Sequence, residues 1–333
     1  MKPLFFISCP IDTYSGYGAH SRDLVKAIIE LDKYDVKILP QMWGNTPWGF
    51  IEDNPEWAFL QDHIWTQHQL PKQPEVWMQI TIPSEFQPIG KFNIGVTAGI
   101  ETTLSPGDWI EGINRMNLTL TSSEHSKKTF LDTVLQKVDQ RTNQPVGEAK
   151  IEKPIEVLFE GVDVEIYKPL DKVDSFPELT NIKEKFAFLF VGQWTHQGLY
   201  NDRKDIGNLI KTFSNTFKDK SPENRPCLLL KTSGVNFSVV DRDEILGRIK
   251  QIQAEVGDNC PNVYLLHGEL SPTEINGLLN HEKVKVHVSF THGEGFGHPL
   301  LLASLSGKPV LSSNWSGHLD FLNPKYTSFF EGS

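Results

Sequence analysis

The sequence has little cysteine, no long apolar run and no excess of positive charge. Its 333 residues include three cysteines, Cys9, Cys227 and Cys260, which have neither disulfide-framework nor metal-ligand spacing. No apolar run approaches the roughly 20 residues of a membrane-spanning helix. The first apolar run is short and is closed by Pro10, which predicts a first strand instead of a secretory signal. We therefore expect a protein without a transmembrane segment, located in the cytoplasm.

Positive charge is scarce as well. Lys and Arg number 32 against 42 Asp and Glu, which gives a net charge of −10. Such a balance argues against a broad phosphate-binding surface, so we expect no stable binding of nucleic acid. A local basic site remains compatible with this composition.

Short apolar runs alternate with helix-length amphipathic segments, a pattern typical of parallel strands joined by crossover helices. In the first half we predict strands at 3–8, 36–39, 76–82, 91–97 and 118–123, helices at 21–33 and 125–135, and a surface hairpin or loop at 136–153. A second series begins with the run at 155–163. It continues with strands at 186–192, 227–234, 262–268, 284–290 and 308–313 and helices at 205–217, 243–256, 271–280 and 298–306.

This alternation predicts an α/β fold of two Rossmann-like domains, each built on a doubly wound parallel sheet. We place the division after residue 157, so that residues 1–157 and 158–333 form the two domains. Ligands of open α/β sheets bind outside the carboxyl ends of the strands. Two such domains facing each other would form a cleft at those ends.

A first glycine motif, SGYGAHSRDL, follows the first strand. Gly16 and Gly18 allow the backbone to approach a ligand, and a following helix directs its positive end at an anion. A dinucleotide fingerprint requires a third glycine, where Ser21 stands. The alternative is a strand-to-helix turn that needs flexible residues for its own geometry.

A basic pair, Arg203 and Lys204, stands at the start of the predicted helix at 205–217. An arginine grips phosphate oxygens in a fork and a lysine acts as a point charge, so the pair suits a diphosphate. The alternative is an exposed helix start. Cations are disfavoured at a helix N-terminus, which favours the functional interpretation.

The stretch HGEGFGHPLLLASLSGKPV at 292–310 places a glycine turn before a short helix. Pro299 suits the first turn of that helix. Backbone N–H groups of the turn converge near Glu294 and offer donors for hydroxyl or phosphate oxygens. A glutamate inside a glycine turn is an odd choice for packing alone, so we predict a ligand-binding role for it.

Tryptophans gather in the first half, and two of them stand in the sequence WGNTPWGF at 43–50. The Gly, Asn and Pro content predicts a loop. Trp43 and Trp48 can stack on sugar faces or pack beneath the loop, and both interpretations stay open.

These motifs, in this order, resemble the retaining glycosyltransferases of family 4, also called group 1, which have the GT-B fold. The resemblance is strong from about residue 156 to 321 and looser before it. It implies that Gly16 and Gly18 meet the donor phosphates or the acceptor. It also implies that Lys204 neutralises the diphosphate, and that Glu294 contacts the hydroxyls of the donor sugar.

Family members carry an arginine just after the glycine that follows the first strand of the second domain, and this chain has Gln193 there. The resemblance further implies that Arg203, which lies on a longer loop, takes the place of that arginine. The segments FEGVD and NWSGHLDF are also similar to segments of the family. The donor-contacting residues implied in this way are Gly192, Gln193, Gly295, Phe296 and Gly297, besides the catalytic Arg203, Lys204 and Glu294.

The chain departs from the family at three points. Leu302 stands where a second glutamate binds the nucleotide ribose, and we expect it in the first turn of its helix. Family members often have a histidine on the first domain near the donor sugar. The corresponding stretch IGVTAGIETT has no histidine, although it contains Glu101. The chain stops at Ser333, where family members continue with further helices, so we expect a C-terminally trimmed chain.

The function that the resemblance implies is the transfer of a hexosyl or pentosyl group from a nucleoside diphosphate donor to an acceptor hydroxyl, with retention. It needs no metal and no cofactor. The acceptor could be a glycan, a lipid-linked glycan, a small molecule or a modified base, with Trp43, Trp48 and Glu101 on the acceptor side. Two alternatives remain: a sugar-nucleotide or glycan binding protein with little turnover, and a nicotinamide-dependent oxidoreductase.

Overall fold

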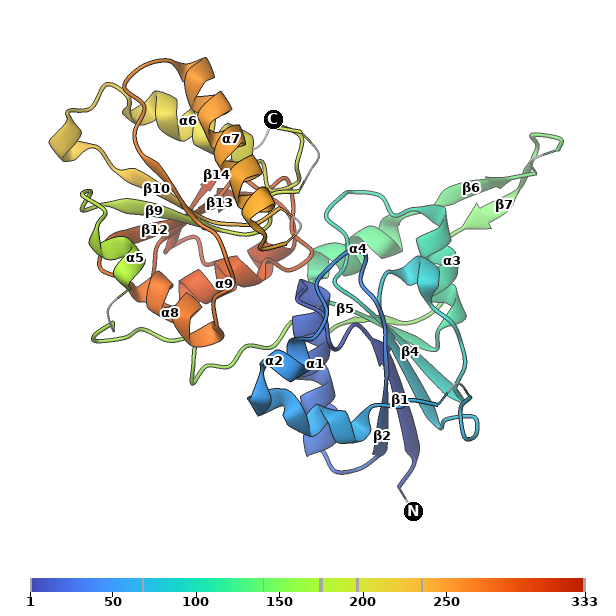
Figure 1. The fold of residues 1–333 in the computed structure, drawn as a ribbon. Helices are drawn as coiled ribbons and strands as arrows, with labels where there is room; N and C mark the ends of the chain where they lie inside the picture. Colours follow the sequence, from blue (N-terminus) through green and yellow to red (C-terminus); the bar gives the residue numbers. More distant parts are fainter. Residues whose placement is uncertain are drawn as a thin grey trace. The chain divides into compact units, whose positions relative to one another are not determined.

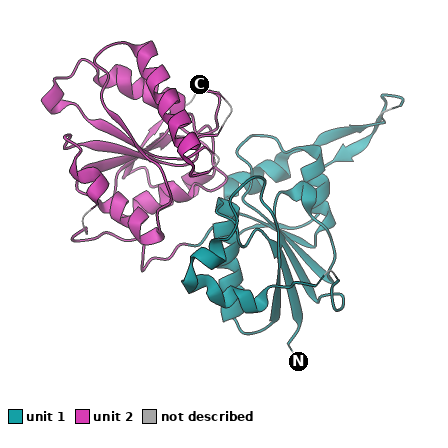
Figure 2. Cartoon of the chain, in the orientation of Figure 1, with its two compact units in different colours: residues 1–161 teal, residues 162–333 magenta. Residues whose placement is uncertain are grey.

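The chain folds into two compact units, residues 1–161 and 162–333 (Figure 2). A computed structural model describes residues 2–67, 69–139, 141–173, 176–195, 198–234 and 236–331. The sequence pattern predicts a division after residue 157, and the structure divides the chain after residue 161.

The first unit is built on a six-stranded parallel sheet in the order β2-β1-β3-β4-β5-β8 (Figure 1). Its strands are β1 (Leu4–Cys9), β2 (Asp35–Pro40), β3 (Val76–Ile80), β4 (Phe92–Thr97), β5 (Leu118–Thr121) and β8 (Ile155–Val157). The chain direction across the sheet reverses between β1 and β3, where a ligand crevice forms in open parallel sheets.

Helices cover both faces of this sheet. They are α1 (Gly16–Glu30), α2 (Phe50–Asp53), α3 (Gly107–Arg115) and α4 (Glu124–Asp132), with 3-10 helices η1 (Pro55–His63) and η2 (Pro83–Glu85). Side chains of α1, α2 and η1 share one core cluster with Phe5 and Ile7, whereas α3 and α4 share another with Phe6. Alternate residues of β1 therefore face opposite helical layers, as a strand period of two requires.

The predicted surface hairpin is present as β6 (Leu135–Val138) and β7 (Pro145–Ala149), paired antiparallel. It projects from the body of the first unit (Figure 1). The run at 155–163 does not begin the second series, because its strand β8 pairs with β5 and extends the first sheet. A three-residue strand next to a linker carries too little pattern to reveal its partner.

The second unit also has a six-stranded parallel sheet, in the order β11-β10-β9-β12-β13-β14. The strands are β9 (Ala187–Val191), β10 (Cys227–Lys231), β11 (Val263–Leu266), β12 (Val284–Ser289), β13 (Val310–Ser313) and β14 (Thr327–Phe330). Strand β14 is not among the strands predicted from the sequence. Numbered along the chain, this order is 3-2-1-4-5-6, the Rossmann order, whose ligand crevice opens at the adjacent ends of the first and fourth strands. Those strands are β9 and β12.

The helices of this unit are α5 (Pro177–Thr180), α6 (Ile206–Phe217), α7 (Val239–Val256), α8 (Pro272–Asn280) and α9 (His298–Leu305), with η3 (Pro222–Asn224) and η4 (Gly317–Asp320). Leu229 of β10 packs in the cluster that contains α8 and α9, and Leu230 packs in the cluster with α6 and α7. Strands buried on both faces are expected to be almost entirely apolar, as β9 and β10 are. In the part of the chain that the structure describes, no helix is both long and apolar enough to cross a membrane.

Helix α1 begins earlier than predicted. Ser15 is its N-cap and accepts a hydrogen bond from the Gly18 N–H at 2.9 Å. A β-carbon on Gly18 would lie 2.3 Å from the Thr13 carbonyl oxygen, whereas one on Gly16 would meet nothing within 4 Å. The glycine at 18 is therefore required for the contact between α1 and the loop before it.

We predict that replacing Gly18 by alanine destabilises the fold, whereas the same replacement of Gly16 has little effect on stability. Gly18→Ala should lower the free energy of unfolding by about 1–3 kcal/mol, because the new methyl group overlaps backbone atoms. Gly16→Ala should change it by less than about 0.5 kcal/mol. Urea unfolding of both variants measures the difference, and equal losses would contradict this packing role of Gly18.

Candidate functional site

The loop before α6 and the turn before α9 meet at the carboxyl ends of β9 and β12. The His292 N–H donates to the Arg203 carbonyl at 2.9 Å, and Arg203 Nη1 donates to the Gly293 carbonyl at 2.7 Å. Thr291 Oγ1 closes the turn by donating to the Gly293 carbonyl at 2.9 Å. These bonds hold two segments about 90 residues apart in one fixed arrangement.

Glu294, Arg203 and Lys204 form a charge cluster in this arrangement. Lys204 Nζ lies 2.5 Å from Glu294 Oε1, and Arg203 Nη1 lies 2.9 Å from Oε2. The Glu294 side chain is 7% exposed, that of Lys204 is 13% exposed and that of Arg203 is 44% exposed. One buried carboxylate therefore holds two cations, and the cluster carries a net positive charge.

The electrostatics of Glu294 follow from this pairing. Burial by itself raises the pKa of a carboxyl group, but the charges and hydrogen bonds of Lys204 and Arg203 outweigh burial and hold the pKa of Glu294 at about 2. The carboxylate is therefore ionised at neutral pH. It is an acceptor, not a proton donor.

Two residues that the sequence analysis did not assign support the glycine turn, residues 294–297. The Glu294 N–H donates to Ser316 Oγ at 2.8 Å, and the Gly317 N–H donates to the Glu294 carbonyl at 3.0 Å. Ser316 has a φ of 81°, a conformation that side chains other than glycine rarely adopt. A β-carbon on Gly317 would lie 2.1 Å from the Gly295 carbonyl oxygen. The similarity of NWSGHLDF to a segment of the family was the available signal for both residues.

His287 of β12 is a third residue near the site that was not predicted from the sequence. It is buried, and no partner of its Nδ1 atom is present among the described residues. Burial, together with the Lys204 charge, lowers the pKa of this imidazole to about 3. The ring is therefore neutral at physiological pH. A histidine within the apolar run VKVHVSF was the signal that could have found it.

The remaining predicted residues of the second unit lie around this cluster. Gly192 directly follows β9, and a β-carbon there would lie 3.7 Å from the Lys204 side chain. Gln193 Nε2 donates to the Gly234 carbonyl at 2.6 Å. Phe296 is buried with its ring 5.1 Å from that of Phe321. Gly297 is the N-cap of α9, with a φ of 98°.

Leu302 does not lie in the first turn of its helix. Helix α9 begins at His298, before Pro299, so Leu302 is its fifth residue. Its side chain is 6% exposed and packs in the core cluster that includes Leu189 and Val310. It contributes no polar group to the site, and a carboxylate at this position would have to enter an apolar core.

In the first unit, the tryptophan loop, residues 43–50, is bound to the segment after β1. The N–H groups of Gly49 and Phe50 both donate to the Asp12 carbonyl at 3.1 Å, and Trp48 forms a β-bridge with Thr13. The loop therefore lies at the carboxyl edge of the first sheet, as Gly16 and Gly18 do.

Tyr17 organises the surroundings of this loop. Its ring stacks on Trp43 with centroids 4.0 Å apart, and its hydroxyl oxygen accepts from the Ala98 N–H at 3.0 Å. Burial raises the pKa of Tyr17 to about 12, and the charges of Glu101 and Glu160 add to the rise. Glu101 therefore lies in the electrostatic neighbourhood of the Trp43 and Tyr17 rings.

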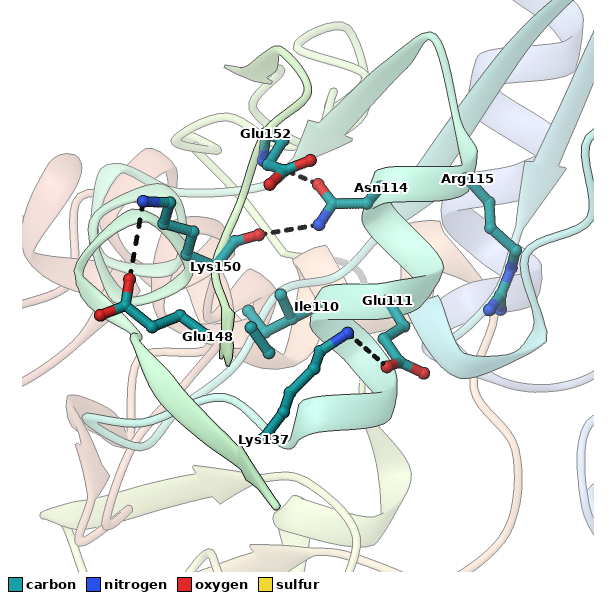
Figure 3. Close-up of a pocket in the computed structure, with 9 residues that line it drawn as sticks. Ile110, Glu111, Asn114, Arg115, Lys137, Glu148, Lys150 and Glu152 are labelled. Atoms are coloured by element: carbon teal, nitrogen blue, oxygen red, sulfur yellow. Dashed lines mark hydrogen bonds and ion pairs between the residues drawn. The ribbon is translucent and has the colours of Figure 1, made fainter. Parts of the chain in front are cut away.

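A pocket of about 340 Å³ lies elsewhere in the first unit, between α3 and the hairpin (Figure 3). Lys137 pairs there with Glu111 at 3.1 Å, and Lys150 pairs with Glu148 at 3.6 Å. None of the residues predicted for the site lines this pocket. Within the described ranges, no three His, Cys, Asp or Glu side chains are placed to hold a metal ion.

Comparison with protein-family models and with curated proteins finds no match. Solved structures do match. HepE from Anabaena, solved with UDP and glucose, has a TM-score of 0.62 at 12% identity over 99% of this chain and 86% of its own. A sucrose-phosphate synthase from Thermosynechococcus elongatus has the same four values. A glycosyltransferase from Rickettsia africae has a TM-score of 0.63 at 12% identity, over 100% of this chain and 85% of its own.

These likenesses establish the fold. The chain has two Rossmann-like domains with parallel sheets and the GT-B fold of its structural neighbours. The predicted fold class is thereby confirmed.

The charge cluster predicts a pH-dependent stability. Since the pKa of Glu294 in the folded chain lies below the ordinary value of 4.5, its pairing stabilises fully above pH 4.5 and is lost as the pH falls toward 2. Glu294→Gln should lower the unfolding free energy by about 1.5–3 kcal/mol at neutral pH, and the deficit should shrink in acid. Urea unfolding at about pH 7, 5 and 3 measures it. A deficit that does not vary with pH would exclude the ionic pairing as its cause.

Proposed function

We propose that this chain is a glycosyltransferase whose second unit binds a nucleoside diphosphate sugar. The observation that carries this proposal is the position of Glu294, Arg203 and Lys204 at the carboxyl ends of β9 and β12. A parallel sheet with this strand order binds its ligand there. Two cations and one ionised carboxylate suit a ligand with a diphosphate at one end and hydroxyl groups at the other.

The cations are suited to the diphosphate. Arg203 is 44% exposed, and the planar fork of a guanidinium matches phosphate oxygens. Lys204 is more deeply buried, where a charge acts at lower dielectric and binds more strongly. The N-terminus of α9 follows the glycine turn, and its N–H groups and dipole add a further attraction for an anion.

Glu294 and the diphosphate compete for the same cations. In the structure both cations bind the Glu294 carboxylate. An arriving diphosphate would draw them away, and hydroxyl groups of the donor sugar would then satisfy the carboxylate. The sugar and the diphosphate of the donor thus bind cooperatively, because neither part alone provides partners for the two cations and for the Glu294 carboxylate.

The reaction is a group transfer. The bond between the anomeric carbon and the diphosphate oxygen breaks, and the bond from the acceptor oxygen to that carbon forms. The proton of the acceptor hydroxyl passes to the departing diphosphate oxygen. Lys204 and Arg203 stabilise the charge that develops on this oxygen. Attack from the face that the diphosphate leaves gives retention, and no step requires a metal or a cofactor.

The structural neighbours support the proposal. HepE was solved with UDP and glucose, and the two other structures are named as a sucrose-phosphate synthase and a glycosyltransferase. A second candidate is a sugar-nucleotide binding protein with little turnover. The burial of Leu302 favours it, because this position offers the ribose no hydrogen bond.

A donor screen tests the proposal. The purified chain is incubated with nucleoside diphosphate sugars that differ in base and sugar, and release of the nucleoside diphosphate is followed by mass spectrometry. Release from at least one donor, lost in Glu294→Gln, supports the transferase. Donor binding without release supports the binding protein. If no donor binds, both the transferase and the binding protein are rejected.

We predict that Lys204→Ala weakens the binding of the nucleoside diphosphate alone by about 1.5–3 kcal/mol, the range for hydrogen bonds to charged groups. Lys211→Ala is the matched control, because this lysine lies on α6 and pairs with Glu255 at 3.4 Å. Isothermal titration measures both variants. Equal affinities in the two variants would remove Lys204 from the diphosphate site.

Glu294→Gln should have effects of opposite sign on binding and on turnover. Removing the carboxylate takes away an anion that competes for both cations, so the nucleoside diphosphate alone should bind several-fold more tightly. Turnover should fall by about 100-fold or more, because a preorganised polar contact to the reacting sugar is lost. If the cluster only stabilised the fold, titration and donor-release assays of the variant would show neither change.

A further inference from the structure

The carboxyl edge of the first sheet carries aromatic rings on a fixed support. Tyr17 and Trp43 stack with an interplanar angle of 25°. Trp48, in the same loop, is 43% exposed. The Ile51 N–H donates to Asp12 Oδ1 at 2.7 Å and the Tyr14 N–H donates to the Pro47 carbonyl at 3.0 Å. Hydrogen bonds therefore hold the second half of the loop, and the ring stack on Tyr17 holds its first residue, Trp43.

The same edge lacks cations in its connecting segments. Residues 10–15, 41–49, 81–85, 98–106, 122–123 and 158–161 follow the six strands, and none of them is Lys, Arg or His. They include four acidic residues, Asp12, Glu85, Glu101 and Glu160. In the second unit, the segment after β9 supplies both Arg203 and Lys204.

The nearest Lys and Arg side chains on the following helices have partners in the fold. Arg22 of α1 is buried, and its Nη1 donates to the Ile11 and Thr13 carbonyls at 2.9 Å. Lys127 of α4 pairs with Glu156 at 2.8 Å. A phosphate arriving at this edge would meet carboxylates, with these cations already engaged.

From these observations we infer that the carboxyl edge of the first sheet binds the acceptor as an uncharged saccharide, one ring of which lies against the tryptophan loop. This inference rests on the proposed function. Indole and phenol rings offer broad apolar area with a polar tip, which matches the mixed surface of a pyranose. The acidic side chains accept hydrogen bonds from hydroxyl groups.

The same charges select against other acceptors. Like charges brought together at a binding surface disfavour the wrong ligand by several kcal/mol. A sugar phosphate or nucleic acid would bring negative charge to an edge whose connecting segments contain acids and no bases. We therefore exclude these classes and retain glycans and neutral small glycosides.

Binding without a donor tests the inference separately from turnover. The probes are the methyl glycosides of glucose, galactose and mannose, each beside its 6-phosphate, and a single-stranded oligonucleotide. Saturation-transfer NMR with the whole chain gives each affinity. The quantity that decides is the loss of probe affinity that Trp48→Ala causes, because Trp48 belongs to the first unit and Glu294 to the second.

We expect at least one neutral glycoside to bind about tenfold more tightly than its 6-phosphate and to lose about fivefold or more in Trp48→Ala. Phe59→Ala is the matched control, because this ring of η1 is also exposed. Glu101→Lys should reduce the difference in affinity, the gap, between the neutral glycosides and their 6-phosphates. Asp35→Lys, at the opposite end of the strands, makes the same charge change and should leave the gap as it is.

Three results would overturn the inference: no Trp48-dependent binding of any neutral probe, equal or tighter Trp48-dependent binding of a 6-phosphate, or Trp48-dependent binding of the oligonucleotide. If one of these results is found while the donor screen shows donor release, the proposed transferase function is kept and only the proposed acceptor class is rejected. Trp48-dependent glycoside binding without donor release keeps the saccharide site and removes the transferase.

Discussion

One buried carboxylate constrains the second unit. An ionised glutamate cannot be removed from water at low cost unless cations and hydrogen bonds replace its hydration. Glu294 obtains them from Arg203 and Lys204, and its backbone from Ser316 and Gly317. Three segments of the chain must therefore hold their positions for this one group to be tolerated. The same requirement keeps two cations at the site before any ligand arrives.

Sheet topology brings these segments together. In the order 3-2-1-4-5-6, β9 and β12 are neighbours although two strands intervene in the sequence. Loops leaving their carboxyl ends must diverge to opposite faces, and the space between them forms the crevice. Helix α6 packs on one face and α9 on the other, so Lys204 and Glu294 approach from opposite sides.

The two units have different chemistry on similar scaffolds. The second unit concentrates cations around an acid after β9 and β12, whereas the first places rings and acids after its strands. Each unit shares its fold plan with the other, so the difference lies in the connecting segments. In the proposed function, this division assigns the anionic substrate to one unit and the uncharged substrate to the other.

The sequence by itself determined the alternation of strands and helices, the Rossmann-like plan, and the basic pair and the glycine turn as two separate candidate motifs. Periodicity and turn chemistry are local, and they are readable because each residue reports on its own segment. Tertiary structure decided the partner of β8, the strand β14, the start of α1 and the core position of Leu302. It also revealed Ser316, whose positive φ is maintained by the turn that it supports, and His287, which is buried beside the charge cluster. Such roles depend on contacts between distant segments, and local sequence patterns do not encode which distant group will lie opposite.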